Sequence, residues 1–380
     1  MKPHAFIPGN EAMSVPSLRR RPSPVRISAP AGVGAATLDD AEPSPAPYGQ
    51  FDDKAILITG ATGSFGRRFI RTLLERSRVR RVVIYSRDEF KQYEMQQELA
   101  TGAGGNALRF FIGDVRDRNR LALAMREIDI VIHAAALKHV PAAEYNPMEC
   151  IRTNINGAEN VVQAALQCGV ARVLALSTDK AANPINLYGA SKLASDKIFV
   201  AANNLSGSVG TRFSVVRYGN VVGSRGSVIP FFRKLIDQGA ETLPITDERM
   251  TRFWITLQQG VDFVAGAIAM MRGGEIFVPK IPSMRMLDLA HAMAPGMPTR
   301  VIGIRPGEKL HEVMVTEDDS RQTLELADRY VIEPAFNFWA REPYWDLGAR
   351  PVPDGFRFAS DTNSDWLDAA RLARLMMEAH

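Results

Sequence analysis

The sequence has little of several features that would restrict its function. It contains only two cysteines, Cys150 and Cys168, in 380 residues, so free thiols in a reducing compartment are expected rather than a disulfide framework. No apolar run approaches the ~20 residues that a membrane span needs. The formal net charge is only +4, and no basic helix with interleaved aromatic residues indicates a nucleic-acid surface. We therefore expect a cytoplasmic protein without nucleic-acid or membrane partners, and we predict no metal site.

The N-terminal extension differs in composition from the rest of the chain. Residues 1–50 are rich in Pro, Ala and Ser and lack apolar periodicity, which predicts a disordered tail. Three arginines at positions 19–21 could suggest targeting, but no apolar stretch follows them as in a secretory signal. A start at the internal Met13 would also account for this segment.

The remaining chain is long enough, and at 46% hydrophobic residues apolar enough, to bury a full α/β core. Short apolar runs predict strands at residues 55–59, 81–85, 106–112, 129–133, 172–176 and 213–217. Helices are expected up to residue 76, at 154–167 and at 263–271, with a short one between 361 and 380. Such alternation predicts an α/β fold with a doubly wound parallel (Rossmann) sheet. Residues 51–217 would form the dinucleotide-binding domain, and 218–380 mainly a smaller substrate-binding lobe, interleaved with the core.

A glycine-rich loop follows the first predicted strand and precedes a helix. In that context glycines spaced as in this loop indicate a dinucleotide site. Glycine lets the backbone approach a pyrophosphate, to which the helix N-terminus donates N–H groups. A tight strand–helix turn without a ligand is the alternative. The residues concerned are Gly60, Thr62, Gly63, Ser64, Phe65 and Gly66.

The end of the second predicted strand bears on the choice of cofactor. It lies about twenty residues past the glycine loop, where a ribose contact is expected. An acid there, such as Asp88, favours NAD, whereas Ser86 and Arg87, with Lys91, could hold the 2′-phosphate of NADP. We favour NADP; a plain surface charge is the alternative for Arg87.

The third and fourth predicted strands also end in residues that suit a dinucleotide. Asp114, beside Val115, could accept a hydrogen bond from the adenine amino group. Small side chains at Ala134 and Ala135 would let the cofactor lie against the backbone. Lys138 points towards the same crevice, whereas the nearby His139 is expected to be a packed or solvent-facing loop residue.

Reactive side chains gather after the fifth predicted strand, at the edge where open α/β sheets bind ligands. Asp179 offers an acid, Lys180 a base and Tyr188 a phenol, and Lys192 lies one helical turn beyond Tyr188. Lowering a phenol pKa from ~10 towards ~7 takes about 4 kcal/mol, which Lys192 and a cofactor cation could supply.

Lys180 must be neutral to act as a base. Burial, with the cations Lys138 and Lys192 nearby, is expected to lower its pKa from ~10.4. A purely structural ion pair with Asp179 is the alternative role.

Polar loops dominate past residue 217. Segments 218–227, 250–254 and 305–309 carry Arg, Asn and Ser that are suited to a diphosphate and a sugar, although each Arg taken alone could be a surface residue. The candidate substrate contacts are Lys138, Thr178, Asn220, Ser227, Arg252, Arg305 and Glu308.

These motifs together resemble the extended short-chain dehydrogenases/reductases, and more narrowly the inverting UDP-N-acetylglucosamine 4,6-dehydratases that begin pseudaminic acid synthesis. Segments 86–92, 133–141, 177–181, 183–189 and 250–254 carry the closer resemblance, which covers roughly residues 51–380. It implies a homo-oligomer with tightly bound, recycled NADP. By this resemblance the cofactor positions are Ser64, Phe65, Ser86, Arg87, Lys91, Asp114, Val115 and Ala134, the substrate positions are Lys138, Asn220 and Arg252, and the catalytic positions are Asp179, Lys180 and Tyr188.

The implied reaction is a hydro-lyase reaction without net oxidation. Tyr188 would take the 4-hydroxyl proton while hydride leaves C4, Lys180 would remove the C5 proton, and Asp179 would protonate the departing 6-hydroxyl. The product would be UDP-2-acetamido-2,6-dideoxy-beta-L-arabino-hexos-4-ulose, for pseudaminic acid, a capsule or an O-antigen. A nucleotide-sugar 4-epimerase is one alternative; a non-catalytic NADP-binding sensor or scaffold is another. Preference for the N-acetyl sugar over UDP-glucose stays open.

Overall fold

A computed structural model describes residues 48–99, 102, 104–207, 210–223, 227–336, 339 and 342–378. The expected N-terminal tail lies outside the described residues up to position 47. The 3-10 helix Tyr48–Phe51 begins the described structure slightly before the expected boundary. The Tyr48 hydroxyl donates to Asp262 Oδ1 at 2.6 Å, and the Arg76 guanidinium lies 5.5 Å from the tyrosine ring. These contacts hold Tyr48 against the folded chain.

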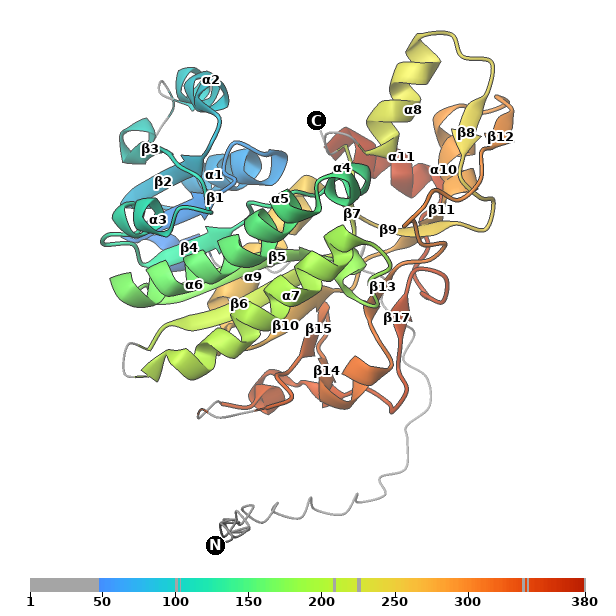
Figure 1. The fold of residues 1–380 in the computed structure, drawn as a ribbon. Coiled ribbons are helices and arrows are strands. Elements are labelled where there is room, and N and C mark those ends of the chain that lie inside the picture. The colour runs from blue at the N-terminus through green and yellow to red at the C-terminus, as the bar shows by residue number, and fades with distance from the viewer. Residues whose placement is uncertain are drawn as a thin grey trace, which may run out of the picture. The chain divides into compact units, whose positions relative to one another are not determined.

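One sheet organises the fold (Figure 1), and among the described residues it has ten strands in the order β16-β14-β15-β10-β6-β5-β4-β1-β2-β3. From β3 to β10 neighbouring strands are parallel, whereas β15, β14 and β16 are antiparallel. The strand order reverses between β1 and β4, so the predicted doubly wound parallel sheet is confirmed. The strands are β1 (Ala55–Thr59), β2 (Arg81–Ser86), β3 (Leu108–Ile112), β4 (Ile130–His133), β5 (Arg172–Thr178), β6 (Arg212–Tyr218), β10 (Ile276–Pro279), β14 (Thr323–Glu325), β15 (Arg329–Ile332) and β16 (Arg350–Pro351).

Helices cover both faces of the sheet. Along β1, Leu57 packs on the side of α3 (Arg118–Ala124), α6 (Gly157–Cys168) and α7 (Leu187–Ala202), whereas Ile56 and Ile58 pack on the side of α1 (Ser64–Arg76), α2 (Glu89–Leu99) and α9 (Leu257–Met270). Successive strand residues point to opposite faces, and here both faces are buried. This explains why the strands are continuous apolar runs rather than alternating patterns.

A second, smaller core belongs to the lobe formed after β6. Trp254, Phe232 and Leu289 are fully or almost fully buried in it. The chain returns from this lobe to the sheet through α9, β10 and β14–β16, so the two parts are interleaved. The lobe contains β7 (Asn220–Val221), α8 (Val228–Asp237), β8 (Leu243–Ile245), β9 (Thr251–Ile255), β11 (Ser283–Arg285), α10 (Met286–Met293), β12 (Thr299–Val301) and α11 (Ala369–Glu378).

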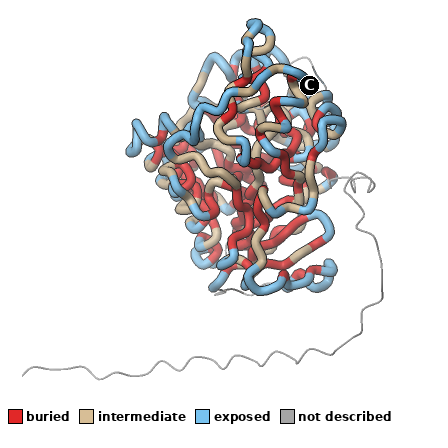
Figure 2. The backbone as a smooth tube through the Cα atoms, turned by 90° about the vertical axis from the view of Figure 1, so that its right-hand side faces the viewer, coloured by how far each residue is buried: buried red, intermediate tan, exposed pale blue. Residues whose placement is uncertain are grey.

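Four short elements also bear on the site. Strands β13 (Val313–Val315) and β17 (Phe358–Ala359) pair antiparallel, and α4 (Val140–Tyr145) and α5 (Pro147–Ile151) follow the end of β4. Figure 2 shows the buried segments concentrated within the body of the fold and the exposed ones along its outer turns. Within the part of the chain that the structure describes, no helix has the length and apolarity to cross a membrane.

Candidate active site

The glycine loop between β1 and α1 lies against the end of β4. Gly60 has φ +66°, and a Cβ there would lie 2.9 Å from Ala135 Cα and N. A Cβ at Gly66 would lie 2.3 Å from the carbonyl oxygen of Ala61, so α1 packs too closely on this turn for any side chain. Gly63 caps α1. The loop therefore has the backbone exposure and close packing that a pyrophosphate site requires.

The residues after β4 pack against this loop. The Thr59 hydroxyl accepts from the Ala135 N–H at 3.3 Å and shares a 2.8 Å hydrogen bond with His133 Nδ1. Burial, and then the charge of Lys192, lower the pKa of His133 to about 3, so this imidazole is neutral. Ala134 and Ala135 are partly buried, and His139 is exposed as expected.

The residues after β2 are those predicted to contact the adenosine ribose. Asp88 accepts from the Lys91 backbone N–H at 3.0 Å and pairs with its ammonium at 2.7 Å. The charge of Asp88 is therefore already balanced by Lys91 of the helix that follows it. Arg87 is exposed and lies 3.6 Å from Asp114 Oδ2, and Ser86 Oγ accepts from Gln92 at 3.0 Å.

Arg116 is a neighbour of this region that the sequence reasoning missed. It contacts Asp114 Oδ2 through Nε at 2.9 Å and Nη2 at 2.7 Å. Burial raises the pKa of Asp114, but the hydrogen bonds and charge of Arg116 outweigh that effect and hold it below its usual range. Asp114 is thus a firmly ionised acceptor, beside the buried Val115.

The predicted acid and base lie in a 3-10 helix, Asp179–Ala181, directly after β5. Asp179 is fully buried. Its Oδ1 accepts from the Thr178 hydroxyl at 2.9 Å and from Lys180 Nζ at 2.9 Å. Its Oδ2 is buried without a hydrogen-bond partner among the described residues. One carboxylate oxygen is therefore held by the protein, and the other has its hydrogen-bonding capacity unused.

Helix α7 brings the phenol and the second lysine to the same place. Asn186 caps the helix by accepting from the Gly189 N–H at 2.8 Å. A Cβ at Gly189 would lie 2.3 Å from the Lys180 carbonyl oxygen, so only glycine lets the start of α7 pack on the 3-10 helix. Tyr188 is buried, and buried Lys192 donates from Nζ to the Leu176 carbonyl at 2.7 Å.

The pKa directions at these groups differ from two of our expectations. Burial raises the pKa of Tyr188 to about 12, and Lys180 and a hydrogen bond with Thr178 only partly oppose it. The protein groups alone therefore do not bring this phenol towards neutrality. Burial lowers the pKa of Lys180, but the charges of Asp179 and Glu312 outweigh burial and hold it well above its usual range. The expected neutral Lys180 is therefore wrong for this arrangement, in which the ammonium is clamped by two carboxylates.

Glu312 was not predicted from the sequence. It immediately precedes β13 and is buried, with Oε1 3.6 Å from Lys180 Nζ and 3.8 Å from Arg252 Nε. Lys309 Nζ lies 3.8 Å from its Oε2. The only signal was its place in the charged segment 308–312, where nothing in the residue pattern says which side chain is buried. The structure thus joins segments near 180, 252 and 310 in one buried charge cluster.

The predicted substrate contacts are dispersed around this cluster. Arg252 is buried and donates to the Thr251 and Lys309 carbonyls at 2.7 and 2.9 Å, and it lies 3.5 Å from Glu308. Lys138 is exposed as a whole, but partial burial of its ammonium, and then the charge of Lys180, lower its pKa. The two lysines therefore lie near each other.

The other predicted contacts are less constrained. Asn220 is partly buried in β7, Ser227 precedes α8 with its hydroxyl buried and unpartnered among the described residues, and Arg305 is exposed. Ser224 and Arg225 of the same predicted loop lie outside the described residues.

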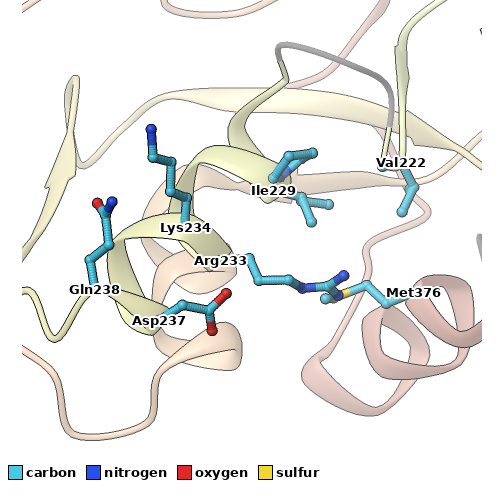
Figure 3. Close-up of a pocket in the computed structure, with 9 residues that line it drawn as sticks. Val222, Ile229, Arg233, Lys234, Asp237, Gln238 and Met376 are labelled. Carbon is cyan, nitrogen blue, oxygen red and sulfur yellow. The ribbon is translucent and has the colours of Figure 1, made fainter.

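A hollow of about 570 Å³ lies between α8 and α11, away from this cluster. Figure 3 shows Arg233 of α8 reaching towards Met376 of α11, with Val222 and Ile229 at one end. None of the residues predicted for cofactor, substrate or catalysis lines it. The chemistry predicted from the sequence therefore centres on the end of β5 and not on this hollow.

Comparison with known proteins agrees with the geometry. Residues 56–334 match the family described as polysaccharide biosynthesis protein. The UDP-N-acetylglucosamine 4,6-dehydratase (inverting) of Campylobacter jejuni subsp. jejuni serotype O:23/36 (strain 81-176) is 57% identical over 327 residues, which cover 85% of this chain and 97% of that protein. The UDP-glucose 4-epimerase of Rickettsia canadensis is 43% identical over 289 residues, covering 74% and 83%.

Solved structures share the fold. Pen from Bacillus thuringiensis superposes with a TM-score of 0.78 at 35% identity, covering 86% of this chain and 98% of that one. DesIV, a dTDP-glucose 4,6-dehydratase from Streptomyces venezuelae solved with NAD and TYD bound, gives a TM-score of 0.61 at 25% identity, with 75% and 93% covered. The chain therefore belongs to the polysaccharide biosynthesis protein family, within the extended short-chain dehydrogenases/reductases, and its resemblance to the inverting UDP-N-acetylglucosamine 4,6-dehydratases is confirmed.

Proposed function

We propose that this chain is a UDP-N-acetylglucosamine 4,6-dehydratase that inverts C5, a hydro-lyase with NADP as its recycled cofactor. The observation that carries the proposal is the pair of buried Asp179 and partly buried Lys180, 2.9 Å apart at the end of β5. A 4-epimerase needs only oxidation and reduction at C4, so it has no use for an acid and a base beyond the tyrosine. The inverting dehydratase of C. jejuni, at 57% identity, supports the same choice.

The glycine loop after β1 and the residues after β2 would hold the cofactor, which would supply a hydride acceptor for C4 of the sugar and a hydride donor for C6. Tyr188 removes the proton of the 4-hydroxyl as that hydride leaves. Its raised pKa has to fall for this step, and Lys192, fixed by its bond to the Leu176 carbonyl, is the cation that the helix provides beside it. Thr178 holds both the phenol and Asp179 in place.

Loss of water then follows from the 4-ketone, which acidifies the C5 proton. Lys180 takes that proton from C5, and Asp179, which has to hold a proton at this point, gives it to the departing 6-hydroxyl, which leaves as water. The proton that Tyr188 took from the 4-hydroxyl can reach Asp179 through the Thr178 hydroxyl, which bonds both groups. A proton then returns to C5 on the opposite face and inverts the centre. Because Lys180 holds a proton beforehand, it has to lose that proton before it can act as the base.

Residues of the adenosine end support NADP over NAD. Asp88 is paired with Lys91, so it is not a free acceptor for a ribose hydroxyl. Arg87 remains exposed beside it and could pair with a 2′-phosphate. The NAD of the DesIV structure supports the coarser conclusion of a nicotinamide dinucleotide.

The test is turnover of UDP-N-acetylglucosamine and of UDP-glucose, followed by the mass of the product. The proposal expects UDP-2-acetamido-2,6-dideoxy-beta-L-arabino-hexos-4-ulose, one water lighter than the N-acetyl substrate, and little product from UDP-glucose. An epimerase would leave the mass unchanged, and a sensor would bind cofactor without converting either sugar. We also propose that the protein is a cytoplasmic homo-oligomer and that its product supplies a surface sugar such as pseudaminic acid.

A further inference from the structure

We propose that Glu312 accepts the surplus proton of Lys180, so that Lys180 becomes the neutral amine that attacks the C5 proton. This inference rests on the proposed dehydratase function and assigns a role to a residue outside the predicted acid, base and phenol. Glu312 is in this sense a positioning and proton-accepting partner of Lys180, and it acts on the sugar only through that lysine.

Backbone hydrogen bonds hold Glu312 in place beside Lys180. Its N–H donates to Ser360 Oγ at 2.9 Å, and its carbonyl accepts from the Ser360 N–H at 2.8 Å. Ser360 directly follows β17, so Glu312 sits where β13 and β17 begin to pair. The glutamate side chain is almost completely buried, whereas about a quarter of the Lys180 side chain is exposed. The lysine can therefore face a ligand while the carboxylate stays behind it.

Glu312 has unused capacity to take a proton. Its Oε2 is buried without a hydrogen-bond partner among the described residues, and the cations Arg252 and Lys309 lie 3.8 Å away, beyond hydrogen-bond distance. Few hydrogen bonds to the charged form leave a carboxylate more basic. Burial raises the pKa of Glu312, although Lys180 opposes the rise. Asp179 Oδ2 is equally unpartnered among the described residues, but the proposed reaction uses the Asp179 carboxyl to protonate the 6-hydroxyl. Glu312 is therefore the carboxylate left to accept the proton of Lys180.

The transfer conserves atoms and charge. The N–H bond at Lys180 Nζ breaks and an O–H bond forms at Glu312 Oε1, 3.6 Å away, which converts an ion pair into a neutral pair. Loss of water from the site on substrate binding favours this change, because a dry environment penalises the charged forms of both groups. Lys180 then takes the C5 proton through its free electron pair. Return of the Glu312 proton to Lys180, once Lys180 has released the C5 proton, completes the cycle.

The charges that face this pair set its pH dependence. They are Asp179 from the same 3-10 helix, Arg252 from β9, Lys309 from the loop before Glu312, and Lys138 from the segment after β4. Arg252 and Lys309 favour the ionised Glu312 before the transfer. Without Glu312, the other carboxylate paired with Lys180 among the described residues is Asp179, which the reaction needs in its protonated form, so the surplus proton of Lys180 has to leave to bulk solvent.

The test is Glu312→Gln, which keeps the side-chain shape and removes the acceptor. Loss of the Glu312 charge lowers the pKa of Lys180, but Asp179 still pairs with the ammonium and the acceptor of its proton is gone. We therefore expect dehydration at neutral pH to slow by about 100-fold or more, while oxidation at C4 continues, so that the reduced cofactor accumulates and its near-ultraviolet absorbance rises. Exchange of the C5 proton for solvent deuterium should slow equally. The variant rate should recover by about tenfold per pH unit as Lys180 loses its proton to solvent, whereas the wild-type rate stays flatter.

Two further variants separate this role from a structural one. Ser360→Ala removes the hydroxyl that accepts from the Glu312 N–H and leaves the carboxylate, so it should keep the wild-type pH profile. Glu312→Asp keeps a proton acceptor at a greater distance from Lys180, so it should show the wild-type pH profile at a reduced rate. This variant also tests the proposal if the Gln variant does not fold.

The proposal is overturned if wild type dehydrates and Glu312→Gln matches its rate and pH profile. It is overturned equally if Gln, Asp and Ser360→Ala variants all lose activity at every pH without accumulation of reduced cofactor. A wild-type protein that expels no water from any nucleotide sugar would instead refute the proposed function.

Discussion

Lys180 Nζ lies 2.9 Å from Asp179 Oδ1 and 3.6 Å from Glu312 Oε1, at the carboxyl end of a central parallel strand. A cation between two buried carboxylates is a stable arrangement that serves structure as well as chemistry. The two roles are separable, because a structural ion pair does not require that its lysine ever lose a proton.

Replacement of Lys180 by Ala tests the base. We expect dehydration to fall by about 10²–10⁴-fold, because the proposed reaction assigns removal of the C5 proton to this lysine. Cofactor binding should be unchanged, as measured by titration of cofactor fluorescence. Lys197→Ala is the matched control, since Lys197 is an exposed lysine of α7, and it should leave turnover as in wild type. Normal turnover by Lys180→Ala would remove the lysine from the mechanism.

Gly60→Ala tests the close approach of the glycine loop to β4. Gly60 and Gly169 share φ +66°, but a Cβ at Gly60 would meet Ala135 backbone at 2.9 Å, whereas nothing lies within 4 Å at Gly169. Gly169→Ala should therefore cost only the left-handed strain of about 1–2 kcal/mol in the free energy of unfolding. Gly60→Ala should cost more than that and also weaken cofactor binding. Urea unfolding and cofactor titration measure both, and equal effects of the two variants would contradict the expectation.

Arg217→Met tests the buried ion pair between Arg217 and Asp196. Arg217 Nη2 lies 3.5 Å from Asp196 Oδ2, and both side chains are almost fully buried. Removing the cation leaves a buried carboxylate and should lower the free energy of unfolding by about 3–5 kcal/mol. A double variant with Asp196→Asn should regain part of this loss; additive losses would mean that the pair is not coupled.

The loss in Arg217→Met should also depend on pH. Burial raises the pKa of Asp196, and Arg217 and then Lys192 oppose it, so removal of Arg217 raises it further. A carboxyl whose folded pKa lies above its unfolded value near ~3.9 lowers stability at high pH. This loss in the free energy of unfolding disappears as the pH falls from above the pKa of the carboxyl in the folded state to below its pKa in the unfolded state. The difference in unfolding free energy between wild type and variant should therefore shrink in acid, and a constant difference would contradict this.

Arg87→Ala tests the choice of cofactor. If Arg87 pairs with a 2′-phosphate, its loss should weaken NADP binding by about 10–100-fold, the equivalent of a charged hydrogen bond, and leave NAD binding nearly unchanged. Arg118→Ala, an exposed arginine on α3 that bonds Gln163, is the control. If binding of NADP and of NAD weakened equally, Arg87 would not contact the 2′-phosphate.

Local residue patterns were sufficient for the sheet. Strands such as Ala55–Thr59 and Arg172–Thr178 are buried on both faces, so their unbroken apolar runs could be recognised without any tertiary knowledge. The third strand begins at Leu108 rather than at the expected residue 106, because Gly105–Ala107 forms a 3-10 helix after the left-handed Gly104.

Long-range electrostatics could not be predicted in the same way. The acid, base and phenol lie within ten residues of one another, and one strand and one helix bring them together. Glu312 is 132 residues from Lys180 in the sequence, and only the interleaved lobe places it there. For the same reason the expected lowering of the Lys180 pKa is wrong. The expectation rested on the cations Lys138 and Lys192, whereas the second carboxylate, Glu312, comes from the residue just before β13.

The measurement that tests the account most directly is the product formed from UDP-N-acetylglucosamine in deuterium oxide, followed by nuclear magnetic resonance from the earliest turnovers. We predict a 4-keto-6-deoxy sugar with one deuterium at C5 and the L-arabino configuration. A hexose of unchanged mass, epimerised only at C4, would contradict the roles assigned to Asp179 and Lys180. A 4-keto product that retains the substrate configuration at C5 would contradict them as well.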